Sequence, residues 1–311
     1  MNSNSIQAAG TQSGVALITA MLIVALATIL TGTALWDFHL DQRRTESLLY
    51  SDLGFNYALG AEAWAARTLV EDAEDDDVDH PEEAWATNLP PLPIDGGTVD
   101  GALADLHGRF NINNLADADG KTDAEAVSQF ERLLTSLDLD SRWAGLLADW
   151  IDADINPNFP DGAEDTVYLG QEPPYRPPNR IVTSISEILA LPEMDLETFN
   201  TLAPHVSALP RGTTINVNTA TVPVLMSLSD DISASDAASI IEDRPEDGYE
   251  NLTELSDVLP EEISAPLSVR SQYFRLAVRV NIGSVELTMY SLLEREGSAG
   301  VRTILRSTGI D

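Results

Sequence analysis

The longest apolar stretch of the chain lies near its N-terminus. From Val15 to Trp36 the residues are mostly Ala, Val, Ile, Leu and Met, and no charged side chain occurs before Asp37. As an α-helix this stretch would be about 33 Å long, enough to cross the hydrocarbon core of a bilayer, which is about 30 Å thick. We therefore predict that residues 15–36 span a membrane once.

The helical pattern continues beyond this stretch. From Thr45 to Trp64 the larger side chains recur every three or four residues, which is the spacing of one helix face. No proline occurs before Pro81. We expect one helix of roughly 55 residues, apolar in its first half, amphipathic over 37–73 and ending near Ala73.

Three further regions follow this helix. Residues 74–114 combine an acidic run, a Pro- and Gly-rich stretch and a weak apolar alternation, which predicts a linker and first strands. Residues 115–267 carry apolar residues at helical spacing. Residues 268–311 alternate and contain a hairpin turn at 281–284, which predicts closing antiparallel strands. The helices expected within the middle region cover 123–149, 184–191, 195–207 and 219–267.

The net charge of the chain limits the classes of partner that it is expected to bind. Asp and Glu number 51 against 17 Lys and Arg, which gives a formal net charge of −34. Such a surface repels nucleic acid phosphates and anionic lipid head groups and favours divalent cations. The chain contains no cysteine, so it holds neither a disulfide nor a thiolate metal site.

The loop over 149–170 is the main candidate for a binding site. Asp152, Asp154 and Asn156 place oxygen donors on alternate residues, so that one loop can wrap a cation such as Ca²⁺, which takes about 6–8 oxygen ligands. The pattern departs from an EF-hand because Pro157 stands where that loop needs glycine. Mg²⁺ fits less well because it demands octahedral geometry, and the alternative is a solvated acidic loop without a metal. The predicted ligands of a structural Ca²⁺ are Asp152, Asp154, Asn156, Asp161, Glu164 and Asp165.

Residues 214–255 resemble the helix-hairpin-helix layout of DNA-binding modules. Those modules hold phosphate with a Gly-rich hairpin and neighbouring basic residues. Here the corresponding turn at 229–233 contains two aspartates, no glycine and no basic residue. We therefore expect the fold without the DNA function, and predict no nucleic acid partner.

Three interpretations compete for the N-terminal 36 residues. A cleaved secretory signal peptide fits poorly, because the apolar run is too long and no basic residue precedes Arg43. A plain signal anchor fits the length. A type IV pilin-like leader fits as well, since a short polar head ends in Gly14 and the apolar helix begins at Val15.

Several features in order along nearly the whole chain carry a family resemblance. They are the Gly14–Val15 junction, the long helix, Asp-Trp-Ile-Asp-Ala-Asp and Gly-Ala-Glu-Asp within 149–165, Pro-Pro-Tyr-Arg at 173–176, Ile-Asn-Val-Asn-Thr-Ala at 215–220 and the closing strands. In this combination the chain resembles the minor pseudopilin K family of type II secretion.

The resemblance implies an α+β fold. A pilin-like long N-terminal helix and an antiparallel sheet would carry a large helical insertion, SAM-like or helix-hairpin-helix-like, over 115–267. It also implies that residues 1–14 form a leader that a prepilin peptidase cleaves after Gly14, with Val15 as the methylated first residue. Most pilins carry Glu at mature position 5, where this chain has Thr19. A subunit at the tip of a filament has no subunit above it that needs this carboxylate.

The resemblance further implies a place in the cell and a set of partners. The protein would cross the inner membrane once, with its C-terminal domain in the periplasm. There it would bind Ca²⁺ and form, with minor pseudopilins I and J, the tip of the pseudopilus that drives protein export across the outer membrane. The major pseudopilin, the prepilin peptidase and secreted substrates are the other expected partners.

Two other functions remain open from the residues. A membrane-anchored metal-dependent hydrolase would use the acidic loop, but the chain has no Gly-x-Ser-x-Gly, His-Glu-x-x-His or phosphate-binding loop motif. His39, His80, His107 and His205 are scattered along the sequence. A membrane-anchored DNA-uptake protein rests only on the helix-hairpin-helix likeness. We therefore expect a protein that is not an enzyme.

Overall fold

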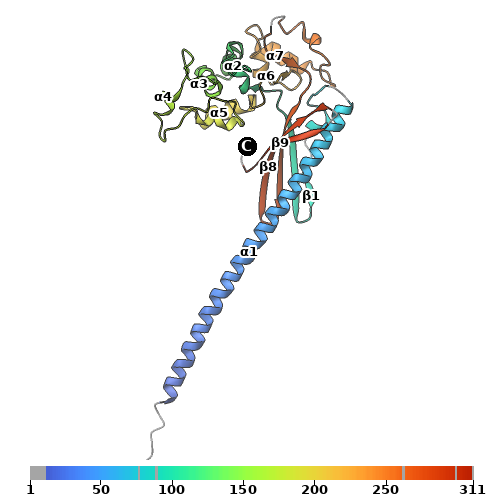
Figure 1. The fold of residues 1–311 in the computed structure, drawn as a ribbon. Helices are drawn as coiled ribbons and strands as arrows, with labels where there is room; N and C mark the ends of the chain where they lie inside the picture. The colour runs from blue at the N-terminus through green and yellow to red at the C-terminus, as the bar shows by residue number, and fades with distance from the viewer. Residues whose placement is uncertain (1–11, 76–77, 88–89, 261–262, 298–299, 310–311) are drawn as a thin grey trace, which may run out of the picture.

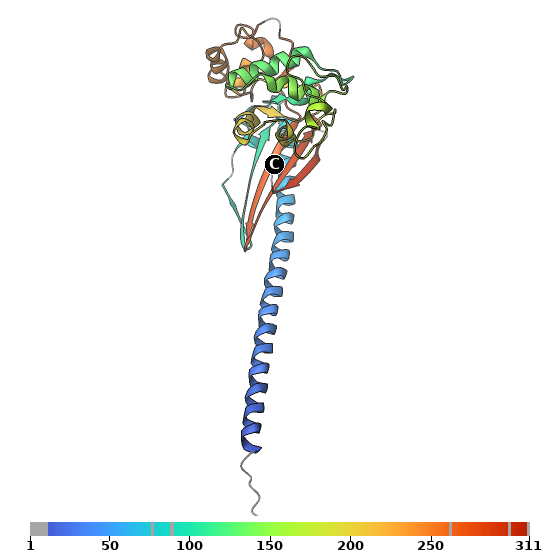
Figure 2. The same cartoon turned by 90° about the vertical axis from the view of Figure 1, so that its left-hand side faces the viewer.

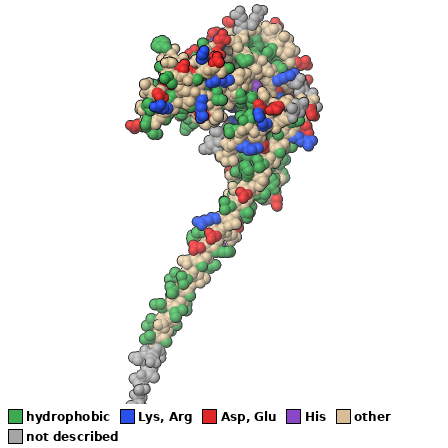
Figure 3. Space-filling view, in the orientation of Figure 1, with side chains coloured by type: hydrophobic (Ala, Val, Ile, Leu, Met, Phe, Trp, Pro, Cys, Tyr) green, Lys and Arg blue, Asp and Glu red, His purple; other side chains and the backbone are tan. Residues whose placement is uncertain are grey.

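A single helix dominates the computed structural model, which describes residues 12–75, 78–87, 90–260, 263–297 and 300–309. Helix α1 runs over Gln12–Asp75 and forms a stem below a compact head (Figures 1 and 2). Its side chains from Val15 to Trp36 are exposed, and the helix is long and apolar enough to cross a membrane. Figure 3 shows that charged side chains appear only above this part of the stem. The expected long helix is confirmed, and it ends two residues beyond Ala73.

One antiparallel sheet packs on the upper half of α1. Its strands follow the order β1-β2-β7-β8-β9, so strands from both sides of the insertion meet as β2 and β7. The predicted turn joins β7 to β8 through Gly283, whose φ of +55° favours glycine. A Cβ there would lie 2.5 Å from the Tyr50 ring of α1. The strands are β1 Leu92–Ile94, β2 Gly97–Asp105, β7 Tyr273–Ile282, β8 Val285–Arg295 and β9 Val301–Thr308.

Buried and less buried residues alternate along β7, and this alternation shows which face of the sheet covers α1. Phe274 and Val278 are buried against α1 residues such as Ala58 and Leu69, as the period of two in a strand requires. The interface also holds a buried carboxylate, Glu62 of α1. The guanidinium of Arg306 donates to Glu62 at 2.7 and 2.8 Å, and the hydroxyls of Ser291 and Thr303 donate at 2.6 and 3.0 Å. A compensated ion pair therefore fixes α1 on β8 and β9.

The helical insertion between β2 and β7 has its own hydrophobic core, separate from the core under the sheet. Short helices and two-residue strands enclose buried aromatic residues such as Phe110 and Phe130, whose rings stack at 5.1 Å. The 3-10 helix η1 (Ala84–Ala86) lies outside the insertion, between α1 and β1. The insertion comprises β3 Phe110–Asn111, η2 Ile112–Leu115, α2 Ala124–Ser136, α3 Arg142–Ile151, α4 Asp165–Tyr168, η3 Ile185–Ala190, α5 Leu196–Leu202, η4 Ala203–His205, β4 Val206–Ser207, β5 Ile215–Asn216, α6 Val222–Met226, α7 Ala234–Glu242, η5 Leu252–Leu255 and β6 Leu267–Ser268.

The helices expected over 123–149 are confirmed, but three details differ. The segment expected as a helix at 184–191 is the 3-10 helix η3, and Pro192 disfavours a helical continuation. The helix expected over 195–207 gives way to η4 at Pro204 and then to the strand β4, because proline lacks the N–H that the helix interior needs. Strand β3 pairs in parallel with β4 rather than joining the main sheet.

Candidate metal centre in the acidic loop

The acidic loop begins where α3 ends and is held by aromatic packing. Trp150 of α3 lies against Tyr168 of α4, with ring centroids 5.2 Å apart, and Tyr175 packs on Tyr168 at 5.4 Å. Both α3 and α4 lie at the end of the molecule away from the N-terminal half of α1 (Figure 1). The buried rings anchor the two ends of a segment that is otherwise polar.

Three carboxylates of this loop converge. One oxygen each from Asp152, Asp154 and Glu164 lie within 4.8 Å of one another, and we call these three residues the loop group. Asp152 and Glu164 are buried, whereas Asp154 is exposed. Among the ion pairs of the described residues, no Lys or Arg pairs with any of the three. The loop group is therefore a concentration of negative charge with no ion-pair partner among the described residues.

Unsatisfied oxygens point to a missing partner in the loop group. Asp152 Oδ1 and Glu164 Oε1 are buried and accept no hydrogen bond from the described residues. The other oxygen of Asp152 accepts from Thr122 Oγ1 at 2.8 Å. Because a buried carboxylate oxygen without a partner is costly, a bound cation would satisfy both orphan oxygens at once.

Asn179 contributes a further oxygen to the same place. Its Nδ2 donates to the backbone carbonyl of Asp154 and to Glu164 Oε2, the latter at 3.4 Å, and its Oδ1 is buried and has no hydrogen-bond partner in the described part of the chain. Asn179 adopts a φ of +47°, a conformation that Asn tolerates better than most residues. Two carboxylates and an amide therefore present unpartnered oxygens, which are the donors that Ca²⁺ prefers.

The electrostatics of the loop agree with its geometry. Burial, and then the charges of Asp149, Asp152 and Asp154, raise the pKa of Glu164 to about 7. Burial likewise raises the pKa of Asp149 to about 6, although Asn158 donates hydrogen bonds to this carboxylate. Without a cation the loop therefore holds protons near neutral pH, and a divalent ion would displace them.

The six predicted ligands do not all meet. Asn156 lies beside the loop group and donates to Asp154 Oδ1 through its backbone N at 2.7 Å. Asp161 is exposed, and Asp165 pairs instead with Arg176 at 3.3 Å. Sequence reasoning missed Thr122 and Asn179, which come from distant segments, and no motif around either residue marks it. The full ligand set stays a prediction.

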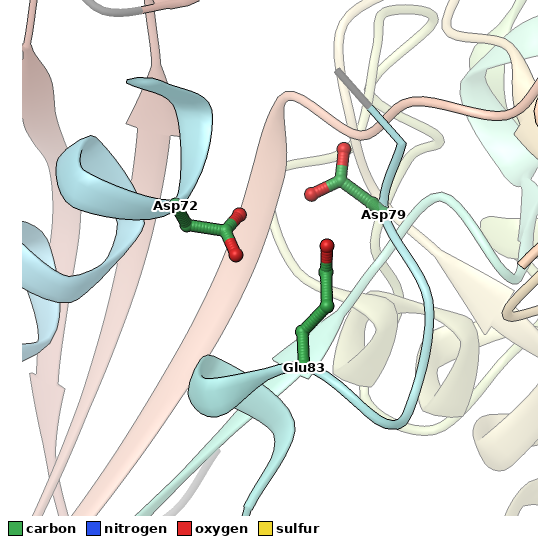
Figure 4. A group of neighbouring side chains, drawn as sticks. All are labelled: Asp72, Asp79 and Glu83. Carbon is green, nitrogen blue, oxygen red and sulfur yellow. The ribbon is translucent and has the colours of Figure 1, made fainter. Parts of the chain in front are cut away.

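A second acidic group shows the opposite arrangement. Asp72 at the end of α1, Asp79 and Glu83 point their carboxylates toward one another (Figure 4), and we call them the junction group. Arg295 at the end of β8 donates to Asp72 at 2.8 Å and to both oxygens of Asp79. Burial, and then the charge of Asp72, raise the pKa of Glu83 to about 8. Arg295 supplies the cation here, so the metal prediction concerns the loop group alone.

The predicted processing residues lie in the exposed part of α1. Gly14, Val15 and Thr19 are helical and exposed, while residues 1–11 of the predicted leader lie outside the described residues. The Thr19 hydroxyl donates to the backbone carbonyls of Val15 and Ala16 at 3.0 Å each. Its polar group is therefore satisfied within the helix, as the interior of a bilayer requires.

Comparison with known proteins gives one consistent result. Two sequence profiles described as type II secretion system (T2SS), protein K match residues 108–211 and 215–270. The type II secretion system protein K of Pseudomonas aeruginosa is 35% identical over 96% of this chain and 93% of its own length. The type II secretion system protein K of Aeromonas hydrophila is 30% identical over 91% of this chain and 93% of its own length.

A solved structure is similar as well. A chain in the crystal structure of the GspK-GspI-GspJ complex from the enterotoxigenic Escherichia coli type 2 secretion system superposes with a TM-score of 0.77 at 29% identity. The match covers 86% of this chain and 100% of that chain. It agrees with the long helix, the antiparallel sheet and the inserted helices described above. The chain therefore belongs to the type II secretion system protein K family and is a minor pseudopilin, with its apolar N-terminal helix as a single membrane anchor.

Proposed function

We propose that this protein forms the tip of a type II secretion pseudopilus together with minor pseudopilins I and J. The observation that carries the proposal is the shape of the chain, a bare apolar stem below a head that the insertion widens (Figures 1 and 2). Stem helices pack side by side in a filament. A bulky head that rises beyond the end of its stem suits a terminal subunit, and the similar solved chain comes from a GspK-GspI-GspJ complex.

Co-purification tests this assembly. The full chain, expressed with the I and J proteins of its own secretion system, is expected to elute with both as one complex in detergent. Omitting J or I separately identifies the direct neighbour. Elution of this chain alone, with I and J intact in the same preparation, would argue against the tip proposal.

Membrane insertion and processing follow from the same proposal. Cleavage after Gly14 by a prepilin peptidase would leave Val15 as the methylated first residue, with residues 15–36 in the inner membrane and the head in the periplasm. Thr19 then occupies the position of the usual pilin glutamate. Mass spectrometry of the mature N-terminus is expected to find methylated Val15, and Gly14→Val is expected to block cleavage.

We also propose that Ca²⁺ occupies the loop group and that its role is structural. The unpartnered oxygens of Asp152, Glu164 and Asn179 support this ion, since all are hard oxygen donors. Among the described residues no histidine belongs to the loop group, where a hydrolase would need one beside its nucleophile, and we infer a binding role without catalysis. Contacts with the major pseudopilin and with secreted substrates are further parts of the proposal.

Thermal unfolding of the full chain in detergent micelles tests the metal. Free Ca²⁺ at about 100 times its Kd would stabilise the fold by about 2.7 kcal/mol, which corresponds to a rise in Tm of roughly 5 °C. EDTA should abolish the rise and Mg²⁺ should not reproduce it. The double variant Asp152→Asn, Glu164→Gln should not respond, and an equal response to Mg²⁺ would overturn the assignment to Ca²⁺.

A further inference from the structure

A phenylalanine side chain of the acidic loop is almost fully exposed. Phe159 is 97% exposed, whereas Phe110, Phe130 and Phe274 are buried in the two hydrophobic cores. Ile155, four residues earlier in the same loop, is 73% exposed. Single apolar side chains are common on protein surfaces, but two large ones within five residues of one loop mark a candidate contact surface.

The backbone that carries this phenylalanine is held in place by its neighbours. Asn158 donates from its backbone N to both carboxylate oxygens of Asp149 at 3.1 and 3.2 Å, and its Nδ2 donates to Thr122 Oγ1 at 2.8 Å. The loop also packs directly on α3, because a Cβ added at Gly145 would lie 3.1 Å from the backbone carbonyl carbon of Asp161. The exposed ring therefore belongs to an ordered loop, and a partner would not have to order this segment on binding.

A cavity lies beside the exposed ring, between α2, α3 and the loop. Its volume is about 260 Å³, slightly below the roughly 300–1,000 Å³ of pockets for drug-sized ligands, so it suits a side chain better than a whole small molecule. Helices α2 and α3, which pack against each other (Figures 1 and 2), contribute two of its walls, and the loop contributes the third. The lining includes Val127 and Glu131 of α2, Ala148 of α3, and Phe159 and Asp161 of the loop.

The charge around this cavity is negative. Its described lining includes the exposed Glu131 and Asp161 and contains no Lys or Arg. Glu131 belongs to α2, outside the acidic loop, so its charge is present whether or not the loop holds a cation. Interfaces pair surfaces of opposite potential. A complementary partner therefore combines an apolar side chain with neighbouring Lys or Arg residues.

A protein partner explains these features better than a lipid surface. Segments that insert into membranes carry Lys or Arg beside their apolar side chains, because anionic lipid head groups attract basic residues. Here Ile155 directly follows the exposed Asp154, and Phe159 lies two residues before the exposed Asp161. The cavity is a second reason, since a side chain of a protein fills it and the surface of a bilayer does not.

We propose that the cavity beside Phe159 binds a basic, apolar peptide segment of a partner protein. An apolar side chain of the peptide enters the cavity between Val127 and the ring of Phe159, and a Lys or Arg of the peptide pairs with Glu131 or Asp161. The proposal depends neither on a metal in the loop nor on the tip position of the subunit.

Fluorescence anisotropy with defined peptides tests the proposal on the full chain in phosphatidylcholine nanodiscs, with empty nanodiscs as the baseline. The basic probe is a fluorescein-labelled Gly-Lys-Leu-Phe-Lys-Gly amide. Its two counterparts are Gly-Gln-Leu-Phe-Gln-Gly amide, without charge, and Gly-Lys-Ser-Ser-Lys-Gly amide, without apolar side chains. We expect each counterpart to bind at least about tenfold more weakly than the basic probe. Equal binding of the basic probe and either counterpart, or no binding of the basic probe, would overturn the proposal.

A pair of apolar variants locates the binding. Phe159→Ser should weaken the basic probe by at least about tenfold, because the ring forms part of the cavity wall. The Tm should not change, because the ring is exposed in the free protein. The matched control Leu196→Ser removes another exposed apolar side chain, at the start of α5, and should leave binding unchanged. An equal loss in Leu196→Ser would mean unspecific apolar adsorption and would refute the cavity.

A pair of charge variants separates the cavity from general attraction to an acidic protein. Glu131→Gln and Glu197→Gln each remove one exposed carboxylate from a helix of the insertion. Glu131→Gln should weaken the basic probe about threefold, and Glu197→Gln should leave it unchanged. Equal weakening would overturn the proposal.

Vesicles test the lipid alternative directly. The nanodisc-embedded chain is mixed with phosphatidylcholine vesicles and sedimented, and we expect it to stay in the supernatant. Co-sedimentation that Phe159→Ser abolishes would place the loop in a lipid surface and would refute the peptide site.

Discussion

The two acidic groups of this protein contain the same chemistry and differ in how their charge is balanced. In the junction group of Asp72, Asp79 and Glu83, the guanidinium of Arg295, which the chain itself supplies, pairs with Asp72 and Asp79. The loop group of Asp152, Asp154 and Glu164 pairs with no described base and leaves buried oxygens without partners. The first arrangement is complete on folding, and the second needs a partner from solution. A cluster of carboxylates is thus informative about metals only once its counter-charges are known.

Removing the internal cation should produce the largest effect. Arg295→Met leaves the buried Asp79 and its neighbours without compensation, so the free energy of unfolding is expected to fall by about 3–5 kcal/mol. Chemical denaturation followed by tryptophan fluorescence measures the change. The control Arg67→Met removes an exposed pair with Glu71 and should change stability by less than about 1 kcal/mol. Similar values for the two variants would contradict the contrast.

Removing a charge from the loop group should have the opposite effect on the free energy of unfolding when no divalent ion is present. Without divalent ions at pH 8, Glu164→Gln removes one charge from a set of like charges and is expected to raise the free energy of unfolding by on the order of 1 kcal/mol. With saturating Ca²⁺ the same variant should be less stable than the parent, because a ligand is lost. The exposed Glu197 of α5 provides the matched control, and Glu197→Gln should change little in either condition.

This change of sign in the stability effect of Glu164→Gln distinguishes a metal site from an acidic loop that binds no metal. If Glu164→Gln destabilises the protein equally with EDTA and with Ca²⁺, its carboxylate serves packing or hydrogen bonding rather than a cation. The comparison uses one variant in two buffers, so a general folding defect would appear in both.

The pH dependence of stability and of Ca²⁺ affinity should distinguish the loop group from most surface carboxylates. The pKa of Glu164 is about 7 in the folded state, above its ordinary value of 4.5. Between these two pH values the folded state therefore holds a proton that the unfolded state has released. Without a cation, the stability contributed by this proton is present below about pH 4.5 and is lost as the pH rises through about 7. Ca²⁺ competes with the same proton, so its affinity should fall by up to about tenfold per pH unit below 7. Calcium titrations at pH 8, 7 and 6 measure this, and an affinity independent of pH would refute the role of Glu164.

What the sequence could and could not predict follows from how local each signal is. The long helix and the β7–β8 hairpin were predictable, because an unbroken apolar run and a Gly-containing turn are read within a few residues. Asp152 and Asp154 were predictable for the same reason, since their spacing is a local pattern. Asn179 was not, because only the folded chain brings it to Glu164. Strand β4 was missed because its partner β3 lies far away in sequence. The pairing of the two strands prevails over the local helical pattern around β4.

Asp161 and Asp165 provide the finest test of this distinction, and the smallest expected effect. The spacing of the sequence includes both among the ligands, whereas in the fold Asp161 is exposed and Asp165 pairs with Arg176. If the loop group holds the ion, Asp161→Asn and Asp165→Asn should each change stability by less than about 1 kcal/mol and Ca²⁺ affinity by less than about threefold. Asp154→Asn, which removes an exposed carboxylate of the loop group, serves as the matched comparison and should weaken Ca²⁺ by far more. A large loss of affinity in Asp161→Asn would mean that the loop closes further around the ion than these contacts indicate, and would favour the ligand set predicted from spacing.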